Sequence, residues 1–229
     1  MSKGGSPLAV ESASPPRGGR RESEAAVERY YRLHARIYDA TRWSFLFGRT
    51  SFLRRLPTDL APRRILEVGC GTGVVLDALA RRFPRSEVLG VDLSDAMLAR
   101  ASRRAAAHRG RVRVERRSYD APCSDSGGFD LVVASYALTM FNPGWEQAID
   151  AARRDLRPGG RMCVVDFHDS PVPWFRAWMR ANHVRMEGQL LPMLRSAFEV
   201  ESESISSAFG GLWRHLTFVG RRDPSGETG

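Results

Sequence analysis

The stretch ILEVGCGTG, residues 65–73, runs from a short apolar segment directly into three glycines at alternate positions, and a helical pattern follows from Val74 to Phe83. An apolar strand, a glycine-rich turn and a helix in that order are typical of the ligand-binding end of an open α/β sheet. Glycine lets the backbone turn tightly and approach a ligand closely, because it has no Cβ. The stretch therefore predicts a first strand, a binding loop and a first helix.

Strand and helix patterns alternate along the rest of the chain. Helical patterns follow the N-cap residue Ser94 and cover 145–152, and strand candidates lie at 88–91, 111–116, 129–134 and 161–167, the last after an expected turn, RPGG, at 157–160. Parallel neighbours need crossover connections, which are normally helical. Two final strand-like runs, 198–205 and 212–219, are joined by SSAFGG and should pair antiparallel. The predicted class is α/β, a doubly wound parallel sheet with an antiparallel C-terminal hairpin.

The chain reads as one domain between two tails. Its 229 residues are 42% hydrophobic, enough for a sizeable core. Residues 1–23 are rich in Ser, Gly and Pro, and we expect a disordered tail there and another over 223–229. From Glu24 the apolar spacing predicts an amphipathic helix, and the aromatic, basic stretch from Trp43 to Leu56 predicts another. The expected domain covers 24–222 and includes these N-terminal cap helices.

Charge, cysteine content and hydropathy indicate the compartment and the partners. The formal charge of +9 is compatible with an RNA-binding module, but the arginines are scattered and no RNP-like aromatic motif accompanies them. The three cysteines form no CxxC pair or zinc-like cluster, so we expect no metal and a reducing compartment. No apolar run is long enough to span a bilayer. We expect a cytoplasmic protein, soluble or peripheral to a membrane, with no nucleic-acid partner.

The glycine spacing and two carboxylates indicate which ligand the loop binds. Asp92 ends the second strand, nineteen residues beyond Gly73, where a carboxylate can accept both ribose hydroxyls of a nucleoside. Dinucleotide-binding loops read GxGxxG, whereas this loop reads GxGxG with Glu67 two residues before it. S-adenosylmethionine carries an ammonium and a sulfonium, for which a carboxylate such as Glu67 is suited. The pattern therefore favours this cofactor over NAD.

Five motifs together resemble the successive motifs of class I S-adenosylmethionine-dependent methyltransferases over residues 64–167: the loop 67–73, Asp92, YDAP at 119–122, FDLVVASYAL and LRPGGRMCVVDF. The resemblance implies a Rossmann-like fold with a seven-stranded, mostly parallel sheet. It also implies cofactor contacts, from Glu67, Gly69, Cys70, Gly71 and Gly73 around the methionine moiety, Asp92 at the ribose, Leu93 and Met97 at the adenine, Asp120 at the adenine amino group, and Ser135 after the fourth strand.

The flanking motifs YRLHARIYDATRWSFLFGR (31–49), SYALTMF (135–141) and VVDFH (164–168) are similar to those of bacterial betaine-lipid methyltransferases, which trimethylate the amine of diacylglyceryl-homoserine. Relatives that act on phospholipids and in the ubiquinone pathway share the YD dipeptide. The resemblance implies N-methylation of a lipid headgroup amine or a small molecule. C- or O-methylation of a quinone or natural product stays open as the alternative. The chain has ASYA at 134–137 in place of the NPPY-type motif of base methylation.

Methyl transfer depends mainly on alignment of the reactants, but an amine acceptor must lose a proton. Five side chains near the expected ligand end of the sheet are candidates for that step: Asp166 and His168 first, then Tyr38, His34 and Tyr136. His34 also fits an ordinary core position, and Tyr38 and Tyr136 could simply pack on the cofactor.

Two segments combine aromatic residues with arginine: 43–56 and PWFRAWMR at 173–180. In the second, we expect Trp174, Phe175, Trp178 and Met179 to share one helix face, with Arg176 and Arg180 beside it. Such a face suits the interface of an anionic bilayer, and a helix packed on the domain core is the alternative.

Overall fold

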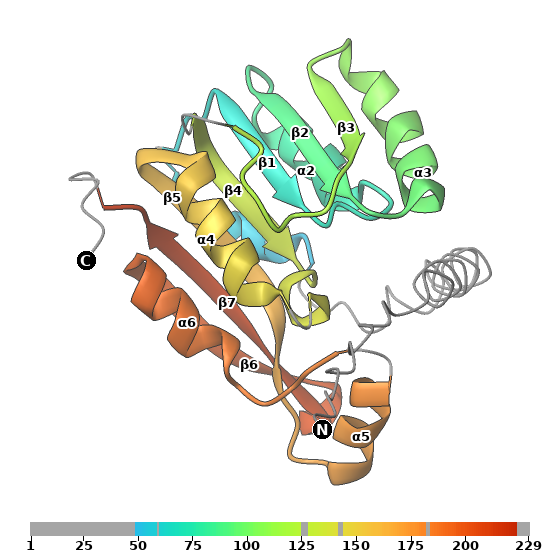
Figure 1. The fold of residues 1–229 in the computed structure, drawn as a ribbon, viewed down its shortest axis with the longest axis vertical. Coiled ribbons are helices and arrows are strands. Elements are labelled where there is room, and N and C mark those ends of the chain that lie inside the picture. Colours follow the sequence, from blue (N-terminus) through green and yellow to red (C-terminus); the bar gives the residue numbers. More distant parts are fainter. Residues whose placement is uncertain (1–48, 59, 125–127, 142–143, 182–183, 224–229) are drawn as a thin grey trace, which may run out of the picture.

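The computed structural model describes residues 49–58, 60–124, 128–141, 144–181 and 184–223. The expected tail 1–23, the helix from Glu24 and all of the expected tail 223–229 except Asp223 lie outside these residues. Seven strands form one sheet in the order β3-β2-β1-β4-β5-β7-β6 (Figure 1). Their bounds are β1 Arg64–Val68, β2 Glu87–Asp92, β3 Val112–Arg116, β4 Phe129–Ser135, β5 Leu156–Asp169, β6 Glu199–Ala208 and β7 Trp213–Arg221.

The strands from β3 to β5 run parallel, and β7 runs antiparallel to both β5 and β6. The chain moves from β1 to β2 and β3 on one side and then crosses to β4 on the other side of β1. Open α/β sheets bind ligands at the carboxyl ends of the strands, where the strand order reverses in this way. The predicted α/β class, the parallel sheet and the antiparallel hairpin are confirmed.

Helices cover both faces of the sheet (Figure 1). Their bounds are α2 Val74–Arg82, α3 Asp95–Ala105, α4 Trp145–Asp155, α5 Pro173–Ala181 and α6 Leu190–Ala197, with a 3₁₀ helix, η1, at Ser51–Arg55. One apolar core contains the buried residues of η1, α2 and α5, and the other contains those of α4 and α6. Ser94 caps α3 as expected, since its side chain accepts a hydrogen bond from the Met97 N–H. Among the described residues, no helix is long and apolar enough to cross a membrane.

One local expectation was wrong. The RPGG stretch, expected as a turn before a strand, lies inside β5, which begins at Leu156. The pairing of β5 with β4 shifts there, from Leu156 opposite Phe129 to Arg161 opposite Leu131, so the extra residues form an irregularity in the ladder. For the helix expected over 43–56, residues 43–48 lie outside the described residues, and the described part contains the 3₁₀ helix η1.

Candidate active site

The glycine loop leaves β1 with all three glycines in the left-handed region, at φ values of 65° (Gly69), 54° (Gly71) and 78° (Gly73). A side chain would strain the backbone at each of them. At Gly69 a Cβ would also lie 2.6 Å from the Cβ of Ala137, which follows β4. The loop therefore packs directly against the segment after β4, and only glycine fits at this contact.

Asp92 closes the loop from the next strand. Its Oδ2 accepts a hydrogen bond from the Gly71 N–H at 2.8 Å, and its Oδ1 accepts one from the Ser94 N–H at 2.9 Å. The side chain is half-buried, and the neighbouring Leu93 is 59% exposed. The structure thus places Asp92, the residue expected to bind the ribose, against the glycine loop, with the exposed apolar side chain of Leu93 next to it.

Glu67 is a buried carboxylate at the end of β1. It is 1% exposed, and its Oε2 has no hydrogen-bond partner among the described residues. Burial raises its pKa to about 8, the nearby Asp92 adds to the rise, and the Arg49 guanidinium opposes it. A buried acceptor without a donor next to a glycine cradle fits a cationic ligand group, which would satisfy both its charge and its lone pairs.

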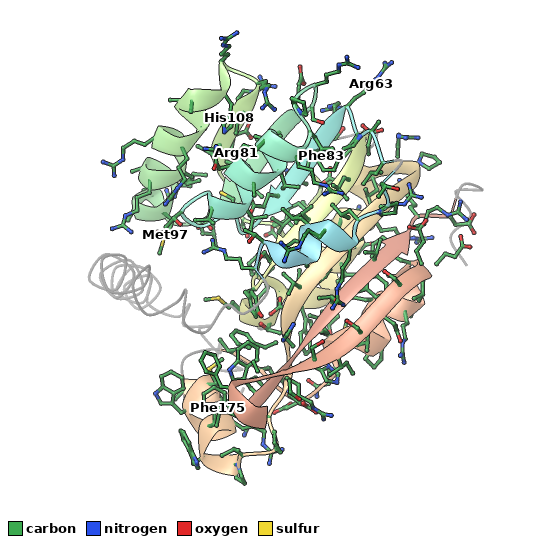
Figure 2. The ribbon with its side chains drawn as sticks, turned by 180° about the vertical axis from the view of Figure 1, so that it is seen from behind. Arg63, Arg81, Phe83, Met97, His108 and Phe175 are labelled. Atoms are coloured by element: carbon green, nitrogen blue, oxygen red, sulfur yellow. The ribbon has the colours of Figure 1, made fainter. Side chains whose placement is uncertain are left out.

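Two other predicted cofactor residues, Cys70 and Met97, have side chains that are buried against other residues of the protein. The Cys70 side chain packs with Leu98 and Ala101, and burial raises the pKa of its thiol. Met97 is 3% exposed at the start of α3, at the place labelled in Figure 2. The backbone of Cys70 shapes the loop, because its N–H donates to the Val91 carbonyl at 3.0 Å.

Of the remaining predicted cofactor residues, Asp120 follows β3 and Ser135 is the last residue of β4. Asp120 is exposed, and the Ser135 Oγ is buried with no hydrogen-bond partner among the described residues. The segment around Asp120 is anchored by Asp155 of α4, whose carboxylate accepts hydrogen bonds from the Tyr119 hydroxyl at 2.8 Å and from two backbone N–H groups. Sequence reasoning missed Asp155, because its partners become visible only in the fold.

Asp166, the first predicted proton acceptor, is fully buried and already holds several donors. Its carboxylate accepts hydrogen bonds from the N–H and hydroxyl of Thr139 and from the Phe167 N–H. Burial raises its pKa to about 6, although these hydrogen bonds oppose the rise. Asp166 therefore fixes the 3₁₀ turn Leu138–Met140, next to Ala137 and the glycine loop, and we expect it to position this turn instead of touching an acceptor.

The other candidates for proton transfer lie in different surroundings. Tyr136 is buried, with its ring 4.8 Å from Phe167 and 6.2 Å from Trp213, and burial raises its pKa. Phe167 belongs to this aromatic core, and His168 follows it where the pairing of β5 with β7 shifts, between Phe167 and Asp169. His34 and Tyr38 lie outside the described residues.

His168 combines partial burial with a nitrogen that could take a proton. Its Nδ1 is buried with no hydrogen-bond partner among the described residues. Burial lowers the pKa of the ring, Arg214 and Arg195 lower it further, and Asp169 opposes them. The ring lies against Gly188, where a Cβ would be 3.4 Å from its Cε1. The imidazole is therefore held in its neutral form at neutral pH.

Comparisons with known proteins agree with this geometry. A family model described as a methyltransferase domain matches residues 65–160. A demethylmenaquinone methyltransferase of Thermus thermophilus is 37% identical over 139 residues, which are 58% of this chain and 62% of that protein. A demethylmenaquinone methyltransferase of Clavibacter sepedonicus is 31% identical over 179 residues, 74% of this chain and 71% of that protein. The chain thus spans less than two thirds of the Thermus relative.

A solved structure shares the fold. The N-methyltransferase NodS from Bradyrhizobium japonicum WM9, in complex with S-adenosyl-L-homocysteine, superposes with a TM-score of 0.63 at 21% identity and covers 76% of this chain and 85% of that chain. The sheet order, the antiparallel β7, the glycine loop and the match to the Clavibacter protein lead to one conclusion. The chain belongs to the class I S-adenosylmethionine-dependent methyltransferases.

Proposed function

We propose that this protein transfers a methyl group from S-adenosylmethionine to a lipophilic small molecule. The observation that carries the cofactor half of the proposal is Glu67, a buried carboxylate whose Oε2 has no partner among the described residues, next to three left-handed glycines. Glu67 and the loop would hold the cationic methionine end, and Asp92 would hold the ribose. When bound, the cofactor supplies a methyl group activated by a positively charged sulfur.

The protein's own contribution is alignment. Asp166 fixes the turn after β4, and Ala137 of that segment packs on Gly69, so the acceptor side and the cofactor loop form one rigid unit. A rigid unit of this kind favours the in-line approach that methyl transfer needs.

Two acceptor classes are supported by different observations. The motifs at 31–49, 135–141 and 164–168 favour the amine of a lipid headgroup, and in its most specific form this is N-methylation in betaine-lipid synthesis. The two relatives named as demethylmenaquinone methyltransferases favour a carbon of a quinone-type ring. Both acceptor classes are lipophilic, so the acceptor that we propose is a lipophilic small molecule of either class.

Transfer of labelled methyl from S-adenosylmethionine into a cell extract tests the proposal. After incubation with the protein, the extract is divided into chloroform-soluble, aqueous, RNA and protein fractions. We expect label in the chloroform phase, in an amine-bearing lipid or in a quinone, and mass spectrometry tells the two apart. Label only in RNA, or only in the aqueous fraction, would contradict a lipophilic acceptor.

Replacing His168 by alanine tests the role we propose for it as proton acceptor for an amine. We expect kcat to fall by about tenfold or more while the affinity for S-adenosylhomocysteine stays the same. In the wild type, turnover should fall as the pH drops below the lowered pKa of His168, since protonation removes the acceptor lone pair. His108→Ala is a matched control, because His108 follows α3 and pairs with Asp77 of α2, not with a residue of β5. Unchanged turnover in His168→Ala would exclude this role.

A further inference from the structure

We infer that α5 and the neighbouring β6–β7 turn form a docking surface for an anionic lipid bilayer, here called the α5 surface and made of Trp174, Arg176, Trp178, Arg180 and Phe209. The inference rests on the proposed function for its purpose, which is access to a lipophilic acceptor. Binding of the α5 surface to a bilayer can be measured without turnover.

The α5 helix divides its aromatic residues between two stripes. Phe175 and Met179, four residues apart, are buried at 2% and 5% exposure and seat the helix on the core. Trp174 and Trp178, also four residues apart, are 66% and 48% exposed. The four residues expected on one side of α5 are thus divided into a buried stripe and an exposed stripe, and α5 combines the core and interfacial characters that we expected as alternatives.

Phe209 extends the apolar area beyond the helix. It is 54% exposed in the turn between β6 and β7, and its ring lies 6.3 Å from that of Trp213 in the aromatic core. Both views place this turn beside α5, at the end of the molecule where Phe175 is labelled in Figure 2. Exposed indole and phenyl rings at one end of a molecule are typical of surfaces that insert into the headgroup region.

The charges around these rings select an anionic partner. Residues 170–186 contain three arginines and no Asp or Glu. Glu187 pairs with Arg180 and with Arg185, while Arg176 is exposed and has no ion pair among the described residues. The whole chain carries a formal charge of +9. On α5, Arg176 lies on the opposite edge of the buried stripe from the two tryptophans, so exposed rings and basic charge border that stripe on either side. This combination fits anionic headgroups better than a zwitterionic surface or a second equally basic copy of this chain.

The position of the α5 surface in the fold determines which end of the sheet would face a bilayer. α5 follows the carboxyl end of β5, and β7 begins at that same end, with Asp169 opposite Arg214. The glycine loop also lies at the carboxyl ends of the parallel strands. A bilayer against the α5 surface would therefore face the end of the sheet that holds the cofactor site, so a lipid-borne acceptor could reach it without crossing the protein.

Flotation with lipid vesicles tests the inference on the whole protein. We expect it to float with vesicles of phosphatidylglycerol and phosphatidylcholine but not with phosphatidylcholine alone. Trp174→Ala combined with Trp178→Ala should lower the fraction bound by about tenfold, and Arg176→Gln should weaken binding to the anionic vesicles alone. The matched control is Val200→Ala with Ile205→Ala, since these apolar side chains are 42% and 43% exposed on β6.

Unchanged melting temperature and unchanged affinity for S-adenosylhomocysteine will show that each variant is folded, whatever the acceptor proves to be. Wild-type protein that fails to float with anionic vesicles would overturn the inference, and so would a double tryptophan variant that floats as well as the wild type. A loss of oligomer mass in that variant, without an effect on flotation, would instead assign the α5 surface to a second copy. Vesicle binding without a labelled lipid product would support the docking surface and contradict the proposal of a lipophilic acceptor.

Discussion

Gly69→Ala should lower the affinity for S-adenosylhomocysteine by at least about 100-fold and destabilise the fold by roughly 2–5 kcal/mol. Two costs add at this position. The backbone has a φ of 65°, which disfavours any side chain, and the new Cβ would lie 2.6 Å from the Cβ of Ala137. Relief of the overlap requires the loop or the segment after β4 to move, and both contribute to the site. Calorimetric titration and thermal unfolding measure the two effects.

Gly110→Ala separates backbone strain from the overlap. Gly110 has a φ of 79°, but a Cβ there would meet no atom within 4 Å. We therefore expect a stability loss of about 1–2 kcal/mol and no change in ligand affinity. If both variants bind the ligand as the wild type does, the close packing of the loop on Ala137 has no role in binding.

Glu67→Gln should have opposite effects on binding and on stability. The affinity for S-adenosylhomocysteine should fall by about 100-fold, or about 3 kcal/mol, because the ligand's ammonium loses its buried counter-charge. The free energy of unfolding of the ligand-free protein should rise by about 1–3 kcal/mol at pH 8.5, since a buried charge with an unsatisfied oxygen is removed.

The stability gain should depend on pH. The pKa of Glu67 is raised from 4.5 to about 8, so between these values the folded protein holds a proton that the unfolded chain has lost. Wild-type stability therefore decreases as the pH rises through this range, and the advantage of Glu67→Gln should vanish near pH 4.5. Glu87→Gln, at an exposed position at the start of β2, is the control and should show neither effect.

The same pKa links ligand binding to protons. A cationic ligand lowers the pKa of Glu67, so binding at pH 6–7 should release up to about one proton. Titrations in buffers of different ionisation enthalpy measure this release, which should be absent in Glu67→Gln. Equal proton release by the two proteins would show that Glu67 does not face the ligand's charge.

Local patterns predicted the cofactor side of the site, and the acceptor side required the fold. The glycine loop and Asp92 are adjacent in the βαβ unit, so their contact follows from the strand order. Asp155 and Asp166 could not be interpreted in this way, because their hydrogen-bond donors lie on segments that come together only by packing. Spacing likewise placed four apolar residues on one side of α5, but which of them are buried depends on the partner that the sheet provides.

The strand order also constrains synthesis on the ribosome. β6 is made before β7, yet β7 is the only sheet neighbour of β6 among the described residues. Until β7 emerges, β6 has nothing to pair with, and β5 has one open edge. Unpaired edges of this kind promote association between nascent chains. A translational pause after β5 has left the ribosome and before β7 has left it should therefore increase aggregation more than a pause within α2.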